Sequence, residues 1–471
     1  MIYQFTSLEF ILFFILVFCI YWLLPKKFKN TFLLLASYVF YASWNYKFLL
    51  LIFTSTMVNY LCGIRIHNSK NIHSRKAFLV LALAANLLLL AFFKYSNFFI
   101  ESFGKLLMYF GIGASPTVLN IILPLGISFY TFEVISYIVD IYRNEFVPTE
   151  NIIEFALFVA YFPKLISGPI ERARNIIPKI QDEKHFNNIN FKENIYLFSY
   201  GLFKKIVIAN SLAPLVNNTF SLANPTGTQI LIAAYAFAIQ IYCDFSGYVD
   251  IARAISGFFG INLIMNFNLP YLSKNPSDFW SRWNITLSYW VRDYVYIPLG
   301  GMYSALLGIF PLLISWILMG LWHGAAFNFI IWGVYWFAIT ILYHFIRHAA
   351  KLIKDWTLWF DIDILKIILM FHVTTYGWII FRSERFSQIV VFTKSLFSGI
   401  NLAGIFNINY LYLWWIIIFL MVYEAMQYYK NDTLFICKKG FYYQLVFYIA
   451  IFIMYINIEP VSNPIFLYFQ F

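Results

Sequence analysis

The sequence predicts an all-α polytopic membrane protein. Of its 471 residues, 61% are hydrophobic and only 12% are charged, and its mean hydropathy is +0.71. A soluble domain of this length cannot keep so much apolar surface out of water. Apolar runs of roughly 20 residues, the length of a helix that crosses a bilayer, recur along the whole chain. We therefore expect about 10–12 membrane-spanning helices, with re-entrant or interfacial helices, around a central tunnel.

The candidate spans follow one another from the N-terminal end of the sequence. The first has no basic residue ahead of it and further spans follow at once, so we do not interpret it as a cleaved signal peptide. No internal repeat or long linker interrupts the series, and residues 1–471 are predicted to form one membrane domain with a short aromatic tail at about 460–471. The spans cover residues 8–24, 31–45, 47–62, 77–95, 118–142, 152–167, 195–215, 229–243, 303–322, 327–345, 364–381, 408–427 and 442–458.

The net charge of +11 includes three basic stretches, KKFKN (26–30), RIHNSKNIHSRK (65–76) and ERARNIIPKIQDEKHF (171–186). The first two fit the positive-inside rule for a multi-pass membrane protein if the N-terminus lies outside. The alternative is that some of these cations attract an anionic substrate at the cytoplasmic face. Nucleic acid is not an expected partner, because the chain has no soluble basic domain.

Charged side chains inside apolar spans are costly and usually face a cavity or a partner. Three such segments also contain glycine or proline, and broken helices at membrane depth are tolerated only where they line protein or water. These segments are therefore predicted to wall an aqueous tunnel. They are residues 123–143 with Glu133 and Asp140, residues 161–174 with Lys164, Glu171 and Arg172, and residues 239–260 with Asp244, Asp250 and Arg253.

The stretch NPSDFWSRWNITLSYWVRDYVYIPLGG, residues 275–301, is predicted to be an amphipathic helix with an aromatic face. Its large apolar side chains follow three- and four-residue spacing, and charged residues lie between them. By itself this pattern is typical of a helix at the membrane surface, and it also suits the wall of a funnel. The aromatic face consists of Trp280, Trp283, Leu287, Trp290 and Tyr294.

One histidine, His323, lies in the apolar stretch MGLWHGAAFNFIIWG, residues 319–333. Its small neighbours, among them Gly320 and Gly324, leave room for a substrate or for close backbone approach. Imidazole titrates near neutrality, so His323 is a candidate general base, a role worth about 10²–10⁴ in rate. The alternative is a histidine satisfied by packing, and His372, in LMFHVTTYGW, is the main competitor.

Other chemistries have little support in the sequence. The four cysteines show no metal or redox spacing, and no second His or Cys lies within a helical turn or two of His323. No G-x-S-x-G nucleophile elbow is present, which argues against a Ser-His-Asp hydrolase. We expect neither a metal site nor a bound cofactor.

Six motifs in order resemble the membrane-bound O-acyltransferase (MBOAT) family, and within it the bacterial membrane subunits of alginate and peptidoglycan O-acetyltransferases. The resemblance runs from about residue 120 to the end of the chain. The motifs are LPLGISFYTFEVISYIVDIYR, YFPKLISGPIERA, YCDFSGYVDIARA, NFNLPYLSKNPSDFWSRWNITLSYWVRDYVYIPLGG, MGLWHGAAFNFIIWG and TTYGWIIFRS.

The resemblance implies transfer of an acetyl group from cytoplasmic acetyl-CoA to a hydroxyl through a tunnel across the bilayer. It places the catalytic histidine at His323 and a second polar residue at Asn284. Relatives of the same branch usually have WHISL-like strings where this chain has WNITL, residues 283–287. Asparagine cannot act as a general base, but its amide can donate to a thioester carbonyl or orient a substrate.

The same resemblance suggests residues that would bind the donor. Guanidinium and ammonium groups can bind the phosphates of CoA, and the aromatic face of residues 275–301 would lie beside them. The positive-inside rule predicts cations at this membrane face in any case, so membrane topology remains the alternative explanation. The candidate donor-binding residues are Lys164, Arg172, Arg282, Arg292 and Trp280.

The chain ends in NPIFLYFQF, with Tyr468 fourth from the end. Related acyl-transfer systems end in similar aromatic tails, so we expect Tyr468 to accept the acetyl group and to pass it to an extracytoplasmic acetyltransferase or acceptor protein. A polysaccharide such as peptidoglycan or an alginate-like polymer would be the final acceptor. The alternative is an aromatic anchor in contact with membrane lipid.

Two other functions remain open. A D-alanyl-type acyltransferase would take its acyl group from a carrier-protein thioester. A transporter of a small anion or of a lipid-linked sugar would perform no chemistry, but it would be expected to show inverted repeats and paired broken helices.

Overall fold

The computed structural model describes residues 4–112, 118–301, 308–352, 362–401, 411–457 and 467. These residues form helices and connecting segments, with no β-strand among them. The all-α class predicted from hydropathy is therefore confirmed. The chain divides into two compact units: residues 1–194 with 252–264, and residues 195–251 with 265–471. That the whole chain acts as one membrane domain stays a prediction.

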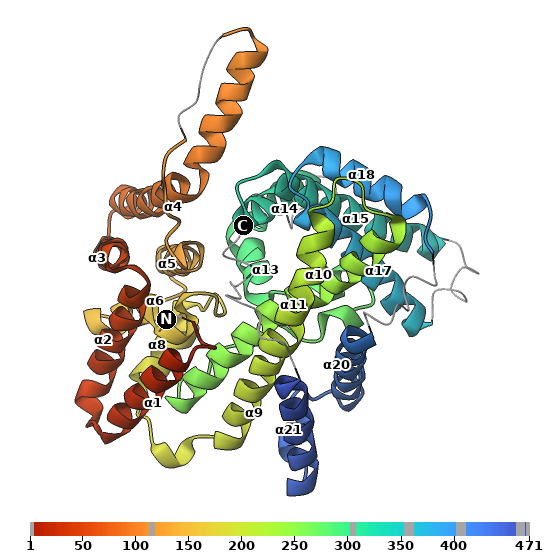
Figure 1. Ribbon diagram of the computed structural model, residues 1–471. Coiled ribbons are helices and arrows are strands. Elements are labelled where there is room, and N and C mark those ends of the chain that lie inside the picture. The colour runs from red at the N-terminus through yellow and green to blue at the C-terminus, as the bar shows by residue number, and fades with distance from the viewer. Residues whose placement is uncertain are drawn as a thin grey trace. The chain divides into compact units, whose positions relative to one another are not determined.

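The first unit is built from the N-terminal helices (Figure 1). Its helix α4 has 38 residues, about 57 Å at 1.5 Å per residue, and is therefore longer than the roughly 30 Å hydrocarbon core of a bilayer. Its helices are α1 (Leu8–Leu23), α2 (Lys26–Asn45), α3 (Leu49–Asn68), α4 (Ile72–Tyr109), α5 (Ile127–Tyr142), α6 (Ile152–Ala160), α7 (Phe162–Leu165) and α8 (Ala173–Gln181), with the 3₁₀ turns η1 (Tyr46–Phe48) and η2 (Phe186–Asn188).

The second unit contains the remaining helices (Figure 1), and two of them, α9 and α11, also have residues in the first unit. Its helices are α9 (Phe191–Leu202), α10 (Ser211–Phe220), α11 (Gly227–Phe258), α12 (Pro276–Trp280), α13 (Ile285–Val291), α14 (Ile309–His323), α15 (Phe327–Leu352), α17 (Asp363–Arg382), α18 (Phe386–Phe397), α20 (Leu411–Lys430) and α21 (Phe441–Ile456). Between them lie two π-helical segments, η3 (Phe203–Asn210) and η5 (Arg292–Tyr296), and the 3₁₀ turns η4 (Pro270–Leu272) and η7 (Phe435–Lys438).

Five helical segments of the described chain are long and apolar enough to cross a membrane, and four shorter apolar helices accompany them. In α11, 89% of the most apolar window is buried inside the protein. A helix that is apolar all round belongs in such a position, with neighbours on every side. The exact count of about 10–12 spans stays a prediction.

The predicted single helix over residues 275–301 is wrong in one respect. Asn284 adopts a left-handed conformation with φ 40° and ψ 53° and separates α12 from α13, which continues directly into the π-helical η5. The aromatic face is nevertheless turned inward, since Trp283 and Leu287 are each only 1% exposed. The three- and four-residue spacing of apolar side chains is the same on both sides of the break, so the sequence pattern did not reveal the break.

A buried ion pair lies in the first unit. Lys164 on α7 forms an ion pair with Glu133 on α5, and both side chains are almost completely buried. The other oxygen of Glu133 accepts a hydrogen bond from the backbone N–H of Glu171, at 3.1 Å. Glu171 in turn accepts the backbone N–H of Ile264, at 2.7 Å. The polar residues predicted to line water thus hold the loop after α7 against α5.

Candidate active site

His323 is the last residue of α14, and it is buried with 4% of its surface exposed. Gly324 has extended backbone angles, φ −167° and ψ 157°, and ends the helix there. The rings of Trp322, Trp332 and Phe381 stand edge-on to the imidazole at centroid distances of 5.0, 5.1 and 5.1 Å. His323 is thus enclosed by aromatic side chains at the end of α14.

The glycines beside His323 bring two helices together. A Cβ atom on Gly320 would lie 2.1 Å from the carbonyl oxygen of Phe329, and one on Gly333 would lie 2.4 Å from that of Trp316. Contacts this short are impossible, so only glycine permits this approach of α14 to α15. Of the two explanations for the small residues, close backbone approach is the one that the structure displays.

The competing histidine is satisfied. The Nδ1 atom of His372 lies 2.7 Å from the carbonyl oxygen of Ile368, which can only accept, so Nδ1 carries the hydrogen. Its Nε2 atom then accepts the hydroxyl of Tyr235, at 2.8 Å. Both ring nitrogens therefore have partners, and His372 is also exposed on the surface of α17. This is a packing histidine.

Asn284 occupies the turn between α12 and α13 and is 1% exposed. Asparagine tolerates the left-handed conformation better than most residues. Its Oδ1 accepts a hydrogen bond from Asn266 Nδ2, at 3.1 Å, and Asn266 Oδ1 accepts the backbone N–H and the hydroxyl of Thr286. Among the described residues, Asn284 Nδ2 has no hydrogen-bond partner. A buried donor of this kind calls for a water or a ligand.

Aromatic rings connect Asn284 to His323. Trp283, the residue before Asn284, packs on Trp378 with 4.8 Å between ring centroids. Trp378 contacts Phe381 at 5.5 Å, and Phe381 contacts the imidazole of His323. The two residues predicted to be catalytic therefore belong to one aromatic shell of the second unit.

Four tryptophans, including the Trp332 that contacts His323, form a cluster beside this shell. The indole of Trp280 lies 4.9, 5.7 and 5.0 Å from those of Trp316, Trp332 and Trp336. All four indole N–H groups are buried and lack hydrogen-bond partners among the described residues. Indole N–H groups can only donate. The region is therefore complementary to a ligand rich in acceptor oxygens, or to water.

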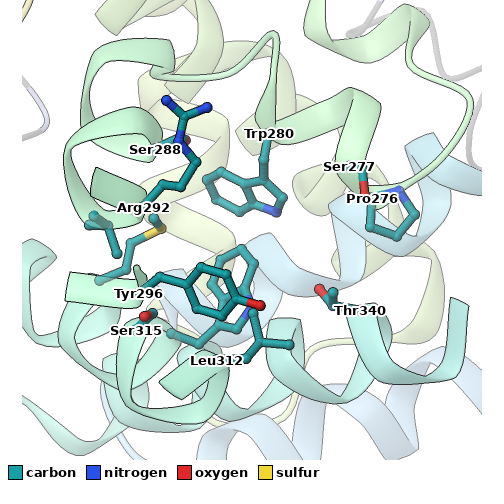
Figure 2. Close-up of a pocket in the computed structure, with 12 residues that line it drawn as sticks. Pro276, Ser277, Trp280, Ser288, Arg292, Tyr296, Leu312, Ser315 and Thr340 are labelled. Atoms are coloured by element: carbon teal, nitrogen blue, oxygen red, sulfur yellow. The ribbon is translucent and has the colours of Figure 1, made fainter. Parts of the chain in front are cut away.

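A pocket of about 290 Å³ opens on this cluster and joins two predicted donor-binding residues, Trp280 and Arg292 (Figure 2). Figure 2 shows the indole of Trp280 with Arg292 on one side of it and Pro276 and Ser277 on the other, and the ring of Tyr296 lies below. The Arg292 side chain is 52% exposed; it pairs with Asp293 at 2.7 Å and lies over the ring of Tyr289. Its guanidinium is thus held in place while remaining open to an anion.

The other predicted donor-binding residues do not line this pocket. Arg282 Nε donates to Asp278 at 2.6 Å, and its Nη1 reaches the carbonyl oxygen of Asn268, so it braces the turn before Asn284. Lys164 and Arg172 are buried in the first unit. The predicted acceptor Tyr468 lies outside the described residues.

Sequence reasoning overlooked several buried polar residues of the second unit. Lys204 and Lys205 lie in η3, inside a predicted span, and form ion pairs with Asp250 and Asp244 of α11. Glu424 on α20 accepts the hydroxyl of Tyr242, at 2.6 Å. A signal was present, because charged residues inside apolar runs are rare, and the string LFKKIVIAN contains two of them.

The model of the membrane-bound O-acyltransferase family matches residues 33–382, which include both His323 and Asn284. The chain belongs to this family. The MBOAT match extends across both units, and the chain is an O-acyltransferase. Its apolar helices place it as a multi-pass protein in the cytoplasmic membrane. Transport without chemistry is thereby removed as an alternative.

Individual MBOAT relatives are similar over most of their length. Probable alginate O-acetylase AlgI of Azotobacter vinelandii is 37% identical over 91% of this chain and 86% of its own. AlgI of Pseudomonas aeruginosa is 39% identical over 84% of this chain and 75% of its own. Peptidoglycan O-acetyltransferase of Helicobacter pylori is 33% identical over 80% and 75%. Teichoic acid D-alanyltransferase of Bacillus subtilis is 31% identical over 57% and 70%.

Proposed function

We propose that this MBOAT protein transfers acetyl groups from cytoplasmic acetyl-CoA, through a tunnel in the membrane, to a relay that serves an exported or cell-envelope polysaccharide. The observation that carries this proposal is the pairing, in one aromatic shell, of a buried histidine at a helix end with a buried amide donor that has no partner in the described part of the chain. Relatives named for O-acetylation of alginate or peptidoglycan support the acetyl group and the polysaccharide acceptor.

The first chemical step is an acyl transfer to a hydroxyl. His323 removes the hydroxyl proton, the oxygen attacks the thioester carbonyl, and a new C–O bond forms as the C–S bond breaks. The CoA sulfur leaves as a thiolate and takes the proton back from the imidazolium. Asn284 Nδ2 donates to the carbonyl oxygen, where negative charge develops, and a donor of this kind is worth about 10²–10³ in kcat.

Tyr468 is the proposed first acceptor. Its phenol oxygen becomes the ester oxygen, and the acetyl-tyrosine is an activated ester because phenolate is a better leaving group than an alkoxide. In the second transfer a hydroxyl of an extracytoplasmic partner attacks this ester, and the phenol is regenerated. Only a two-carbon group crosses the membrane in this scheme, so the polyanionic nucleotide stays in the cytoplasm.

The pocket beside Trp280 is the proposed place for part of the donor. It combines an apolar wall, indole N–H donors and the half-exposed guanidinium of Arg292. A phosphate of CoA would suit Arg292, because guanidinium groups bind phosphate oxygens with two parallel hydrogen bonds. Arg282 supports the same wall through Asp278. Lys164 and Arg172 have buried surroundings that favour a structural role over donor binding.

A D-alanyltransferase is the second candidate. The relative of that name matches only 57% of this chain, whereas the acetylases match 80–91% of it. The longer match favours the acetyl donor. Both candidates use the same chemistry at the carbonyl, so only the donor separates them.

The test is one incubation of the purified protein with acetyl-CoA that carries an isotope label in the acetyl group. Peptide mass spectrometry then locates the label in the unmodified protein and in the His323→Ala, Tyr468→Phe and His372→Ala variants. We expect label on Tyr468 that is lost in the first two variants and retained in the third, because both nitrogens of His372 are already used in packing.

Each other result has a definite meaning. Label elsewhere, or thioester hydrolysis without labelling, overturns the tyrosine relay but leaves the transferase. Retention of label in His323→Ala overturns the role of that histidine. Label obtained only from a D-alanyl carrier-protein thioester establishes the second candidate in place of the first.

A further inference from the structure

Two ion pairs connect the π-helical segment η3 to α11. Lys204 Nζ lies 2.6 Å from Asp250 Oδ2, and Lys205 pairs with Asp244. The pairs are close because glycines face each other between the helices: a Cβ on Gly247 would lie 2.8 Å from the carbonyl oxygen of Gly201. Short π-helical segments within α-helices occur frequently at functional sites.

Asp244 also holds a residue from the far end of the chain. The backbone N–H of Leu467 donates to Asp244 Oδ2, at 2.8 Å, across 223 positions in sequence. Leu467 is 6% exposed, and the side chains of Asp244 and Lys205 are each 4% exposed. One carboxylate oxygen thus serves the lysine and the other serves the main chain of the tail. Hydrogen bonds to ionised acceptors are stronger than neutral ones.

A chain of contacts links the neighbour of Asp244 in sequence to the asparagine of the candidate site. The ring of Phe245, next to Asp244 in sequence, is 5.0 Å from that of Phe267. Phe267 packs on Trp283 at 5.1 Å, and the residue before it, Asn266, donates to Asn284. Ring contacts through Phe267 therefore connect the residue after Asp244 to the turn that contains Asn284.

We propose that the Lys205–Asp244 pair is a docking site for the main chain of the C-terminal tail, and that Asp244 is the positioning residue that presents Tyr468 for acetylation. The proposal rests on the relay described above. Lys205 pairs with Asp244 and orients its carboxylate. The site binds a backbone N–H, so it fixes which residue of the tail lies at Asp244 and does not depend on the side chain of residue 467. Consecutive Cα atoms are about 3.8 Å apart, so holding Leu467 restricts the reach of the next residue.

Docking can be measured independently of chemistry. In the full-length protein, Gln470 is replaced by a reporter cysteine, and the accessible Cys19 and Cys437 are changed to serine. The rate at which the reporter cysteine reacts with a water-soluble maleimide is then measured. We expect Asp244→Ala to raise this rate at least tenfold. Asp250→Ala is the matched control: it breaks the neighbouring ion pair on the same two helices and leaves the rate unchanged.

A second variant removes only the tail side of the contact. Leu467→Pro deletes the backbone N–H and leaves the Lys205–Asp244 pair intact, whereas Leu467→Ala keeps the N–H. We expect Leu467→Pro to reproduce the effect of Asp244→Ala, with no further increase when the two are combined. Leu467→Ala should react as the parent does.

Acetylation provides the functional readout. Asp244→Ala and Leu467→Pro should lower the label on Tyr468 at least tenfold, while transfer from acetyl-CoA to a small phenol added in solution continues. Equal maleimide rates in all variants overturn the docking site. If Asp244→Ala raises the maleimide rate but Tyr468 is not labelled even in the parent protein, the relay is overturned and the docking site stands. Loss of transfer to the added phenol overturns the positioning role, because Asp244 would then act on the catalytic centre itself.

Discussion

The polar residues inside this membrane protein differ in whether their donors and acceptors have hydrogen-bond partners. His372 has partners for both nitrogens, and Lys164 forms an ion pair with Glu133. Asn284 is different, because its oxygen is used by Asn266 while its buried amide N–H₂ has no partner among the described residues. A group left in this state costs free energy. Its retention is explained if substrate completes the hydrogen bond.

Asn284 should therefore be tested without disturbing the backbone. Asn284→Gly keeps the left-handed turn and removes the amide, and Asn284→Asp keeps the shape but replaces the N–H₂ donor with an acceptor. We expect both to lower kcat for acetyl transfer about 10²–10³-fold, as for loss of an oxyanion-hole donor. Stopped-flow or discontinuous assays of CoA release measure this kcat. Full activity in the aspartate variant would contradict the donor role.

The Lys164–Glu133 pair should behave as a structural unit. Lys164→Met leaves a buried carboxylate without its cation, which costs about 3–5 kcal/mol, whereas Lys164→Met with Glu133→Gln should recover much of the loss. Thermal unfolding of the purified protein in detergent gives both changes. If the lysine binds CoA instead, the single variant would unfold normally and raise the KM for acetyl-CoA.

At the scale of elements, the contact between α14 and α15 sets the position of His323. The helices approach so closely that carbonyl oxygens of each face glycines of the other. His323 is at the end of α14, so its imidazole moves with that helix. The aromatic rings of Trp332 and Phe381 then complete its surroundings from α15 and α17.

Gly320→Val should push α14 away from α15. The added Cβ would lie 2.1 Å from the Phe329 carbonyl, and the strain should lower stability by about 1–3 kcal/mol or more. Activity should fall further than stability, because His323 is displaced. Gly440→Ala is the control: a Cβ there meets nothing within 4 Å, so both quantities should stay near those of the parent. A stable, active Gly320→Val protein would contradict this account.

At the scale of the whole molecule, the charge of the loops and the length of the helices determine how the chain crosses the membrane. Basic residues at 26–30 and 65–76 lie at the ends of α2 and α3 that the positive-inside rule assigns to the cytoplasm. Helix α4 begins at Ile72, beside the second of these stretches, and ends at Tyr109. A single crossing would bring Tyr109, which is 85% exposed, to the extracytoplasmic face.

Cysteine labelling of intact cells tests this topology. In a background with Cys19 and Cys437 changed to serine, Tyr109→Cys should react with a membrane-impermeant maleimide, and Asn68→Cys should react only after the membrane is opened. Labelling of both residues from outside would show that α4 does not cross. The reverse pattern would invert the chain and place the N-terminus in the cytoplasm.

The sequence alone predicted the all-α membrane class and, through its resemblance to a family, named His323 and Asn284 as candidate catalytic residues. Hydropathy and motifs are local properties, so they are readable without a fold. The tertiary structure decided what such patterns cannot contain: the left-handed break at Asn284, the satisfied state of His372 and the hydrogen bond from Leu467 to Asp244. These features join residues far apart in the chain, and a hydrogen bond or a helix contact exists only once packing has brought both partners together.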